Sequence, residues 1–340
     1  MSRLVLGIES SCDETAAAVV EGGRAVRSSV VHSQAAEHAV FGGVVPEIAG
    51  RSHLDKILPV VDEALETAGV GLDDLEGVAV TNRPGLIGSL LVGMSAAKAI
   101  AFARGLPLVG IHHIEAHVYS ATMGAEVGEV RYPCLALVVS GGHTALYRAD
   151  SPREMELVAT TLDDAAGEAF DKVAHLLGLE YPGGPSVSKL ADDGNPRAIP
   201  FPRYRPKDGG IGFSFSGLKT SVLYHLRGGD ALQPTPPPEE ISDRADVAAS
   251  FQEAVVEGLV ATTLRAADRL GLDQVLVAGG VACNRRLREV MAERAGAAGV
   301  ASFFPEPRWC TDNAVMIAGL GWHRLAAGER DGWSLDAAPR

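Results

Sequence analysis

The segment LVLGIESSCDETAAAVVE, residues 4–21, decides the fold, because its pattern returns later in the chain. An apolar run, a polar turn and a second apolar run predict two strands joined by a turn. The segment LALVVSGGHTALYRA, residues 135–149, has the same order of apolar run, polar turn and apolar run. Two copies of one strand–turn–strand unit indicate an internally duplicated chain.

A second kind of unit also occurs twice. Residues 77–102, GVAVTNRPGLIGSLLVGMSAAKAIAF, and residues 275–294, VLVAGGVACNRRLREVMAER, each predict a strand, a glycine turn and a helix. The two pairs together predict a duplicated α/β protein, with a cleft between its halves that is lined by the turns.

Two further helices are predicted between these units. One begins at Pro46 and extends over residues 46–65, with a kink or a division at Pro59. The other extends from about Asp243 to Leu270, and Gly271 ends it.

Length and composition indicate a large apolar core and favour two domains over one, since the chain has 340 residues and is 46% hydrophobic. Lys98 and Arg104 interrupt the longest apolar run, so we expect no membrane span. Acidic residues follow the first strand too early for a secretory signal.

The four cysteines are scattered, with no CxxC pair, which is typical of a reducing compartment and predicts a cytoplasmic protein.

The formal net charge of −13 argues against nucleic-acid binding through the overall field of the molecule. A chain of this charge that handled RNA would need local basic patches or a partner. The segments FPRYRPKDGG, residues 201–210, and NRRLR, residues 284–288, are the candidate patches, although most such clusters are only solvated surface.

The segment IHHIEAH, residues 111–117, carries a candidate metal site. His113 and His117 are four residues apart, so on a helix they share a face and can hold one ion. Glu115 lies on the opposite side, whereas the H-E-x-x-H pattern of zinc proteases places a glutamate directly after the first histidine. The spacing therefore excludes that protease signature, and it leaves open a two-histidine site or two histidines without a metal.

A third ligand has to come from elsewhere in the chain, and Asp312 in CTDNAVM, residues 310–316, is the best candidate. Its alternative role is to cap the apolar helix that follows it. Two histidines and one carboxylate suit Fe(II) or Zn(II) and leave positions open for an oxygen ligand.

Several turns are candidate contacts for a ligand. SGGHT, residues 140–144, and GGV, residues 279–281, can bring backbone N–H groups to a phosphate or acyl oxygen, or can be plain turns. Asn284 can bind a base or ribose, or cap the next helix. Gly184 in YPGGP, residues 181–185, allows a ligand to approach closely.

Three acidic residues each have a functional and a structural interpretation, and for Asp171 the structural one is favoured. Asp171, in DDAAGEAFDK (residues 163–172), can contact a ligand or belong to a solvated helix face. Asp13 and Glu14 follow the first strand, where they can act as a base, support a metal, contact RNA or stabilise a turn.

Taken together, nine motifs resemble the full motif series of one family, the universal tRNA threonylcarbamoyladenosine transferases of bacterial type, formerly named O-sialoglycoprotein endopeptidases. The resemblance extends from about Gly7 to Met316. The motifs are GIESSCDET, GGVVPEIAGRSH, HHIEAH, VVSGGHT, DDAAGEAFDK, YPGGP, FSFSGLKT, AGGVACN and CTDNAVM.

The resemblance implies a duplicated actin-like fold, as in sugar kinases and chaperone ATPases, with two lobes and a central cleft. We expect an N-terminal lobe over residues 1–131 and a C-terminal lobe over residues 132–312, with a helical insertion at about 163–250. A C-terminal helix within about 313–340 is expected to pack back on the first lobe.

The resemblance also implies an acyltransferase reaction on tRNA. N6 of adenosine 37, in tRNAs that read codons beginning with A, attacks the carbonyl of L-threonylcarbamoyladenylate. AMP leaves, and threonylcarbamoyladenosine (t6A) remains.

Matching the motifs residue by residue assigns the implied roles. The metal ligands are His113, His117 and Asp312, which hold one Fe(II) per subunit, or Zn(II). The motif match does not assign the proton acceptor; from the chemistry of the reaction we expect Asp13 or Glu14 to take this role. Ser188 stands where we expect relatives to have an acidic residue, so it is left out of the site. The substrate-binding positions are Val138, Val139, Ser140, Gly141, Gly142, Asp171, Gly184 and Asn284.

The implied partners are tRNA, a smaller paralogous TsaB-type subunit and a TsaE-type ATPase, and a separate enzyme supplies the adenylate. No membrane is implied. Two other hypotheses stay open at this point: a metallopeptidase, from the histidine pair and the older family label, and a non-catalytic nucleotide-binding scaffold of the actin-like class.

Overall fold

The computed structural model describes residues 4–41, 43–123, 129–206, 209–230 and 233–339. The chain divides into two compact units. Unit 1 comprises Met1–Glu129, Asp150–Met155 and Pro305–Arg340, and unit 2 comprises Val130–Ala149 and Glu156–Phe304.

The first sheet has the strand order β3-β2-β1-β4-β5. Strand β1 pairs antiparallel with β2 and parallel with β4, so the sheet is mixed. Its strands are β1 (Leu4–Glu9), β2 (Glu14–Glu21), β3 (Ala25–Ser33), β4 (Gly77–Arg83) and β5 (Leu108–His112). The helical elements of unit 1 are α1 (Ala35–Ala39), α2 (Pro46–Ala68), η1 (Leu72–Asp74), α3 (Ile87–Arg104), α4 (His113–Ser120), η4 (Pro307–Trp309) and α10 (Ala314–Ala326).

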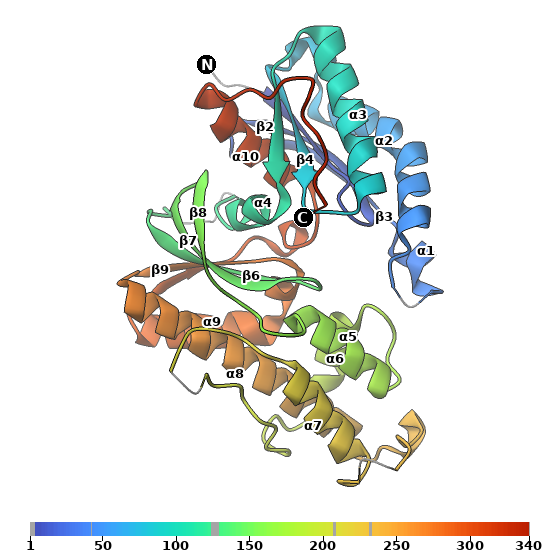
Figure 1. Cartoon of the computed structure of the whole chain (residues 1–340), viewed down its shortest axis with the longest axis vertical. Coiled ribbons are helices and arrows are strands. Elements are labelled where there is room, and N and C mark those ends of the chain that lie inside the picture. The colour runs from blue at the N-terminus through green and yellow to red at the C-terminus, as the bar shows by residue number, and fades with distance from the viewer. Residues whose placement is uncertain (1–3, 42, 124–128, 207–208, 231–232, 340) are drawn as a thin grey trace. The chain divides into compact units, whose positions relative to one another are not determined.

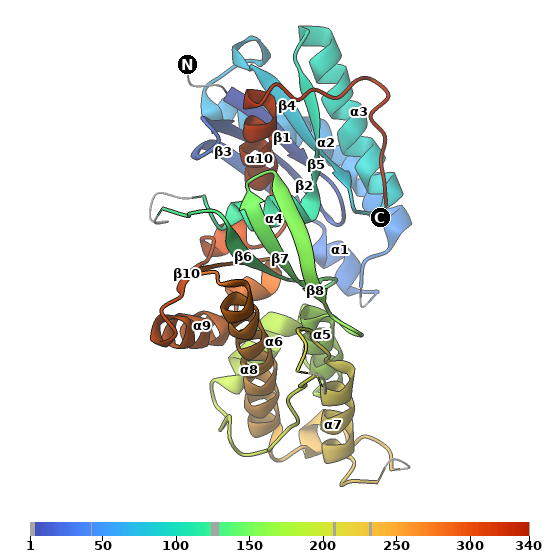
Figure 2. The same cartoon turned by 60° about the vertical axis from the view of Figure 1, so that its left-hand side comes forward.

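The second sheet repeats the first, with the order β10-β9-β6-β7-β8. Strands β6, β7, β8 and β10 of this sheet are labelled in Figure 2. Strand β6 pairs antiparallel with β7 and parallel with β9, as β1 does with β2 and β4. The predicted duplication is therefore confirmed. The elements are β6 (Cys134–Val139), β7 (Thr144–Ser151), β8 (Glu154–Thr160), α5 (Ala166–Leu176), α6 (Gly183–Ala191), α7 (Ser216–Leu226), η2 (Pro238–Glu240), α8 (Arg244–Leu270), β9 (Gln274–Ala278), η3 (Gly280–Cys283), α9 (Arg285–Ala297) and β10 (Ala301–Phe303).

Both faces of the first sheet are covered by helices, which explains why β1 and β2 are apolar at nearly every position. Side chains alternate between the two faces of a strand. Val5 packs with α4 and α10 on one face, whereas Leu6 and Ile8 pack with α2 and α3 on the other. Helix α10, near the end of the chain, thus packs against the first strand (Figure 1).

Helix α2 is continuous from Pro46 to Ala68, so of the two predicted effects of Pro59, a kink or a division, the division is wrong. A proline inside a helix removes one backbone hydrogen bond, but burial on both sides of it offsets that cost. Ile57, Val60 and Val61 are all buried against the sheet. The predicted end of α8 at Gly271 is confirmed, because this glycine has the left-handed φ of 64° that closes a helix.

Among the described residues, α3 is long and apolar enough to cross a membrane by length and composition alone, with a mean hydropathy of 1.3. One face of this helix packs into the core. Met94, Ala97 and Ala101 belong to the apolar cluster beneath the first sheet. The Lys98 ammonium donates to the Leu335 carbonyl at 2.5 Å, in the segment after α10.

Candidate metal centre

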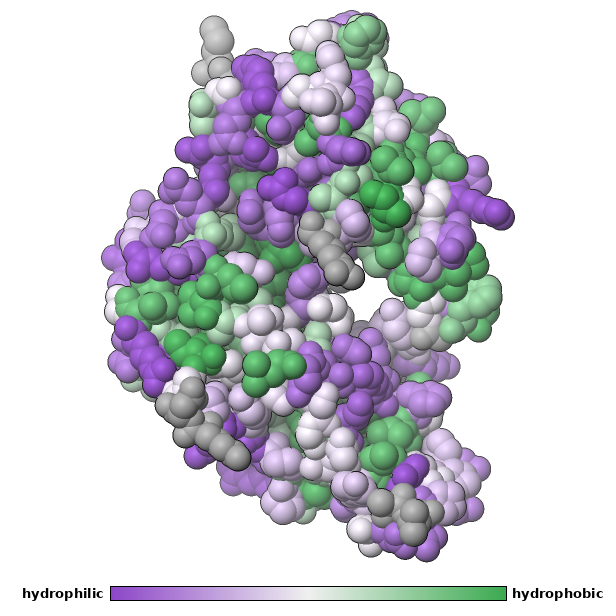
Figure 3. Space-filling model, in the orientation of Figure 1, coloured by the Kyte–Doolittle hydropathy of each residue, from purple (hydrophilic) through white to green (hydrophobic). Residues whose placement is uncertain are grey.

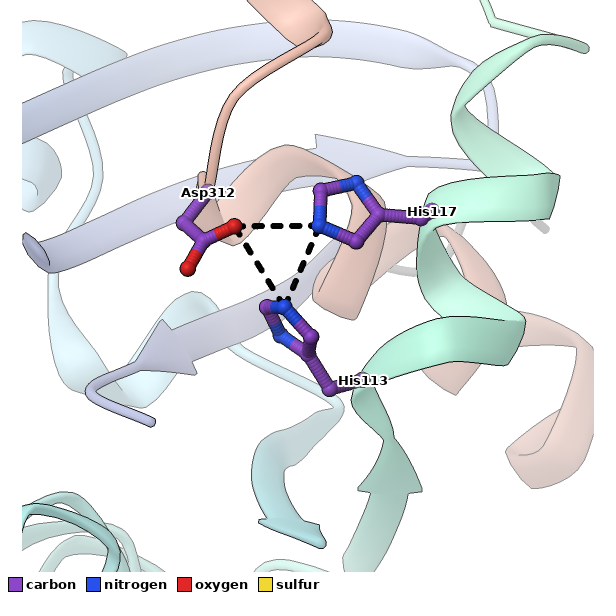
Figure 4. A group of neighbouring side chains, drawn as sticks. All are labelled: His113, His117 and Asp312. Atoms are coloured by element: carbon purple, nitrogen blue, oxygen red, sulfur yellow. Dashed lines mark hydrogen bonds and ion pairs between the residues drawn. The ribbon is translucent and has the colours of Figure 1, made fainter. Parts of the chain in front are cut away.

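The two predicted histidine ligands lie on the short helix α4, which begins directly after β5. The His112 side chain accepts a hydrogen bond from the Ile114 amide and so caps this helix. His113 and His117 project from the same side of α4, and their Nε2 atoms are 3.1 Å apart (Figure 4). Both residues are buried: His113 is 9% exposed and His117 is 2% exposed.

Asp312 enters the same space from the segment that precedes α10 (Figure 4). Its Oδ1 lies 3.0 Å from His117 Nε2 and 3.3 Å from His113 Nε2. The alternative role of Asp312 as a helix cap is wrong, because Asn313 caps α10 by accepting from the Met316 amide. One potential ligand atom of each of the three residues lies within 4.8 Å of the others.

The charges around these three side chains fit a cation. Burial by itself lowers the pKa of His113, but the charges of Asp312 and Glu9 raise it well above its usual value. Burial raises the pKa of Asp312, but His113 and His117 lower it well below its usual value. The buried carboxylate of Glu9 and the half-buried carboxylate of Asp312 therefore favour a positive charge beside them, which a proton on His113 or a divalent cation can supply. Two imidazole nitrogens and one carboxylate oxygen suit Fe(II) or Zn(II).

Glu115 has no part in this arrangement. Burial raises the pKa of its carboxyl, and the neighbouring charges that act on it are Arg83, Arg324 and Glu329. No carboxylate on α4 is therefore placed to activate a metal-bound water, as a zinc protease would need.

Asp13 and Glu14 lie at the start of β2, in the same unit as the histidines. The Ser33 hydroxyl donates to Glu14 Oε1 at 3.3 Å, and the Asp13 carbonyl accepts from the Gln34 amide. Burial, followed by the charges of Asp312 and Asp13, raises the pKa of Glu14 to about 9. A carboxyl with this pKa is protonated at pH 7 and has to lose that proton before it can act as a base.

The raised pKa of Glu14 predicts how the stability of the metal-free protein depends on pH. Above pH 4.5 the unfolded chain releases a proton that the folded chain retains, so stability falls as pH rises from about 4.5 to about 9. Glu14→Gln removes this loss and is expected to stabilise the metal-free protein by on the order of 1–3 kcal/mol at pH 8.5. Urea unfolding at pH 5, 7 and 8.5 measures the difference, with the exposed Glu63→Gln as the control. Parallel stability curves for wild type and Glu14→Gln would contradict this prediction.

The predicted substrate turns lie in unit 2, at the carboxyl ends of two neighbouring parallel strands. Turn 140–143 follows β6 and turn 279–283 follows β9, so the two are adjacent. Gly279 has a φ of 93°, and a Cβ there would lie 2.5 Å from the Val139 carbonyl oxygen, so only glycine fits. Gly141 and Gly142 are exposed, and a Cβ on either would meet no atom within 4 Å. The missing side chains of Gly141 and Gly142 therefore leave space for a ligand beside this turn, while the Ser140 carbonyl accepts from the Gly167 amide.

Not every predicted substrate position has a side chain that can reach a ligand. Val138 and Val139 are fully buried in β6, which leaves only their backbone atoms, and Ser140 is half-buried at the end of this strand. The Asp171 carboxylate accepts from the Gly183 amide at 2.7 Å and so holds the start of α6. Burial raises the pKa of Asp171.

The glycine that packing requires in YPGGP is Gly183, where a Cβ would lie 2.6 Å from Asp171 Cα. Gly184 faces open space, which leaves room for a ligand. Ser188 lies further along the same helix, α6, and is half-buried.

Asn284 has a structural role that can be separated from substrate binding. Its Oδ1 accepts from the Leu287 amide at 3.0 Å and caps α9, while its Nδ2 donates to Gln252 Oε1 at 2.8 Å. We expect Asn284→Ala to lower the free energy of unfolding by about 1 kcal/mol and Asn284→Ser, which keeps a cap, to cost less than about 0.5 kcal/mol. If the amide also binds substrate, both variants raise KM. Urea unfolding and steady-state kinetics separate the two roles, and an alanine variant as stable as wild type would contradict the cap.

The sequence interpretation missed the residues that surround His113. Glu9, Ser11 and Thr81 lie at the ends of β1 and β4 and contact the imidazole or one another. The sequence feature that could have pointed to Glu9 is a glutamate at the last position of an otherwise apolar strand.

The basic patches are partly neutralised where the structure describes them. Arg203 pairs with Glu257, and Arg286 pairs with Glu253. Lys207 lies outside the described residues.

The sequence profile of one family, described as TsaD: tRNA N6-adenosine threonylcarbamoyltransferase, matches residues 25–319. A protein of that name from Geobacter sulfurreducens is 57% identical over 334 residues, which cover 98% of this chain and 95% of that protein. Another, from Anaeromyxobacter dehalogenans strain 2CP-1, is 52% identical over 341 residues, which cover 98% of each chain.

Two solved structures with low sequence identity share the fold. One is component A of (R)-2-hydroxyglutaryl-CoA dehydratase from Acidaminococcus fermentans, with a TM-score of 0.55 and 15% identity over 95% of this chain and 99% of that chain. The other is HypF from T. kodakarensis, with a TM-score of 0.61 and 16% identity over 96% of this chain and 48% of that chain. The predicted actin-like fold is confirmed by these likenesses together with the duplicated strand order.

Proposed function

Because this chain belongs to the tRNA N6-adenosine threonylcarbamoyltransferase family, we propose that His113, His117 and Asp312 hold the metal ion of that reaction. The chain is a transferase that attaches a threonylcarbamoyl group to N6 of adenosine in tRNA and so forms t6A. The observation that supports the metal proposal is that the two histidines lie together with the carboxylate of Asp312, which is 195 residues after His117 in the chain.

The reaction sets two requirements for the site. The exocyclic amine of adenine is a weak nucleophile, so the enzyme must position it and make the carbonyl of L-threonylcarbamoyladenylate more electrophilic. When bound, the metal would supply a Lewis acid for an oxygen of that donor. Adenosine 37 lies in the anticodon loop, where an unpaired base can be read without melting a helix.

The residues of unit 2 are proposed to hold the adenylate. The exposed Gly141 and Gly142 can donate N–H groups to phosphate or carbonyl oxygens that gain negative charge, and AMP then leaves. Ser140, whose own N–H donates to the His143 carbonyl, would contribute its hydroxyl. Val138 and Val139 would contribute backbone atoms, whereas Asp171, Gly184 and Asn284 would border the bound molecule.

Asp13 or Glu14 is proposed to take the proton from N6. Asp13 directly precedes β2 and Glu14 is its first residue, in the same unit as the three proposed metal ligands, and this placement supports the role. Glu14 has to lose its own proton before it can act. Fe(II), one per subunit, is the proposed ion and Zn(II) the alternative, because the nitrogen and oxygen donor set suits both. A tRNA substrate also supports a cytoplasmic location.

The partner proposal is supported by an exposed apolar surface on α2 and α3, two helices that pack against each other. Leu54 and Leu58 on α2 are 64% and 60% exposed, and Ile87 and Leu91 on α3 are 49% and 45% exposed. Figure 3 shows hydrophobic residues gathered over these helices. A patch of this kind marks a protein interface. We assign it to the TsaB-type paralogue, and a TsaE-type ATPase completes the assembly. Partner surfaces would add positive charge for tRNA to a chain of net charge −13.

Reconstitution tests the function directly. The protein is incubated with both partners, tRNA, threonine, bicarbonate, ATP and the adenylate-forming enzyme, and the tRNA is then digested and analysed by mass spectrometry. We expect t6A to form, to disappear after the metal is stripped and to return when Fe(II) or Zn(II) is restored. If adenosine stays unmodified while every component is active, the proposed activity is wrong. If the same amount of t6A forms with and without metal, the proposed metal centre is wrong.

A further inference from the structure

Glu9 is a fully buried carboxylate at the end of β1, and within the described residues its side chain contacts His113, Thr81 and Ser11. Its Oε2 lies 3.0 Å from His113 Nδ1 and accepts from the Thr81 hydroxyl at 2.6 Å. Its Oε1 accepts from the Ser11 amide at 2.5 Å. A buried carboxylate is costly unless such partners satisfy it, so its position is fixed from three sides.

The position of Glu9 decides which nitrogen of His113 faces the ion. A carboxylate accepts hydrogen bonds but donates none, so Nδ1 of His113 has to carry the proton that faces Glu9. Once the ring is neutral, the lone pair is therefore on Nε2, which is the atom that faces His117 and Asp312. Metal-binding histidines commonly donate their second N–H to a carboxylate in this way.

His117 has no comparable support within the described residues. Its Nε2 faces His113 and Asp312, but its Nδ1 is buried without a hydrogen-bond partner. The protein therefore fixes the ring orientation and tautomer of only one of its two histidine ligands.

We infer that Glu9 is a positioning residue, which prepares His113 to bind the ion through Nε2 and strengthens metal binding without touching the metal. Thr81 and Ser11 hold Glu9 in place for this task. The inference rests on the proposed metal centre and deepens it.

The first test measures metal affinity rather than activity. Zn(II) is titrated into the metal-free protein against a competing chelator, for wild type, Glu9→Gln and Glu9→Ala. We expect roughly tenfold weaker binding for the glutamine variant, whose amide oxygen still accepts from Nδ1, and up to about 100-fold weaker binding for the alanine variant. Glu115→Gln is the matched control, because Glu115 lies on the same helix as His113 but the charges that act on it are those of Arg83, Arg324 and Glu329. The Zn(II) affinity of this variant should equal that of wild type.

The second test needs no variant and is independent of any folding defect. Nitrogen NMR of the Zn(II)-loaded wild type, labelled with 15N-histidine, identifies the metal-bound and protonated nitrogens of His113. We expect Nε2 to bind Zn(II) and Nδ1 to carry the proton. Binding through Nδ1, or equal affinity in wild type and Glu9→Ala, overturns the role of Glu9 alone. A wild type that binds no Zn(II), Fe(II) or Co(II) overturns the metal centre and this inference together.

Discussion

Replacing Asp312 by alanine is expected to remove metal binding and to slow t6A formation by more than about a hundredfold, since even residues behind the metal ligands contribute about 10- to 100-fold in affinity or activity. The variant also leaves His113 and His117 without the charge that both imidazoles face. Bound metal per subunit, measured by elemental analysis, and the single-turnover rate of the reconstituted reaction report the two effects.

Asp73→Ala is the control for this variant. Asp73 is an exposed aspartate whose ion pair with Arg104 lies on the surface, so its loss should change neither metal content nor rate. An Asp312→Ala protein that folds, binds one ion per subunit and modifies tRNA at the wild-type rate would refute the proposed centre. Because Asp312 does not cap α10, loss of activity in this variant cannot be attributed to a lost helix cap.

Replacing Gly7 by alanine is expected to destabilise the protein by about 1–3 kcal/mol or more, because β1 and α10 pack with no room for a side chain. A Cβ at Gly7 would lie 2.6 Å from the Ala318 amide nitrogen and 2.8 Å from Ala318 Cβ. Relief of these contacts has to move α10 away from β1. That movement separates Asp312, just before α10, from Glu9, at the end of β1. Urea unfolding measures the loss of stability, and Zn(II) titration measures the accompanying loss of affinity.

Gly258→Ala is the matched control, because the same atom is added inside helix α8 where nothing lies within 4 Å. Alanine is preferred over glycine in a helix interior, so this variant is expected to gain about 0.5–1 kcal/mol. A Gly7→Ala protein as stable as Gly258→Ala would show that β1 and α10 do not pack as closely as the structure indicates.

The sequence by itself determined the features that depend on near neighbours. The two strands and the turn within residues 4–21 and the end of α8 at Gly271 follow from apolar runs, polar turn residues and glycine, and each lies where it was predicted. The repeated strand and turn pattern identified the duplication. The four-residue spacing placed His113 and His117 on one helical face, because the geometry of a single helical turn depends on no distant contact.

Only the tertiary structure decided which of several plausible roles each polar residue has. Asp312 and Asn313 are equally good caps by composition, and the packing of α10 on β1 assigns the cap to Asn313 and turns Asp312 toward the histidines. The same packing buries Glu9 against His113. Pro59 remains within one helix because the sheet covers its neighbours. These outcomes depend on contacts between segments far apart in the chain, and no local pattern encodes which side chains such contacts bury together.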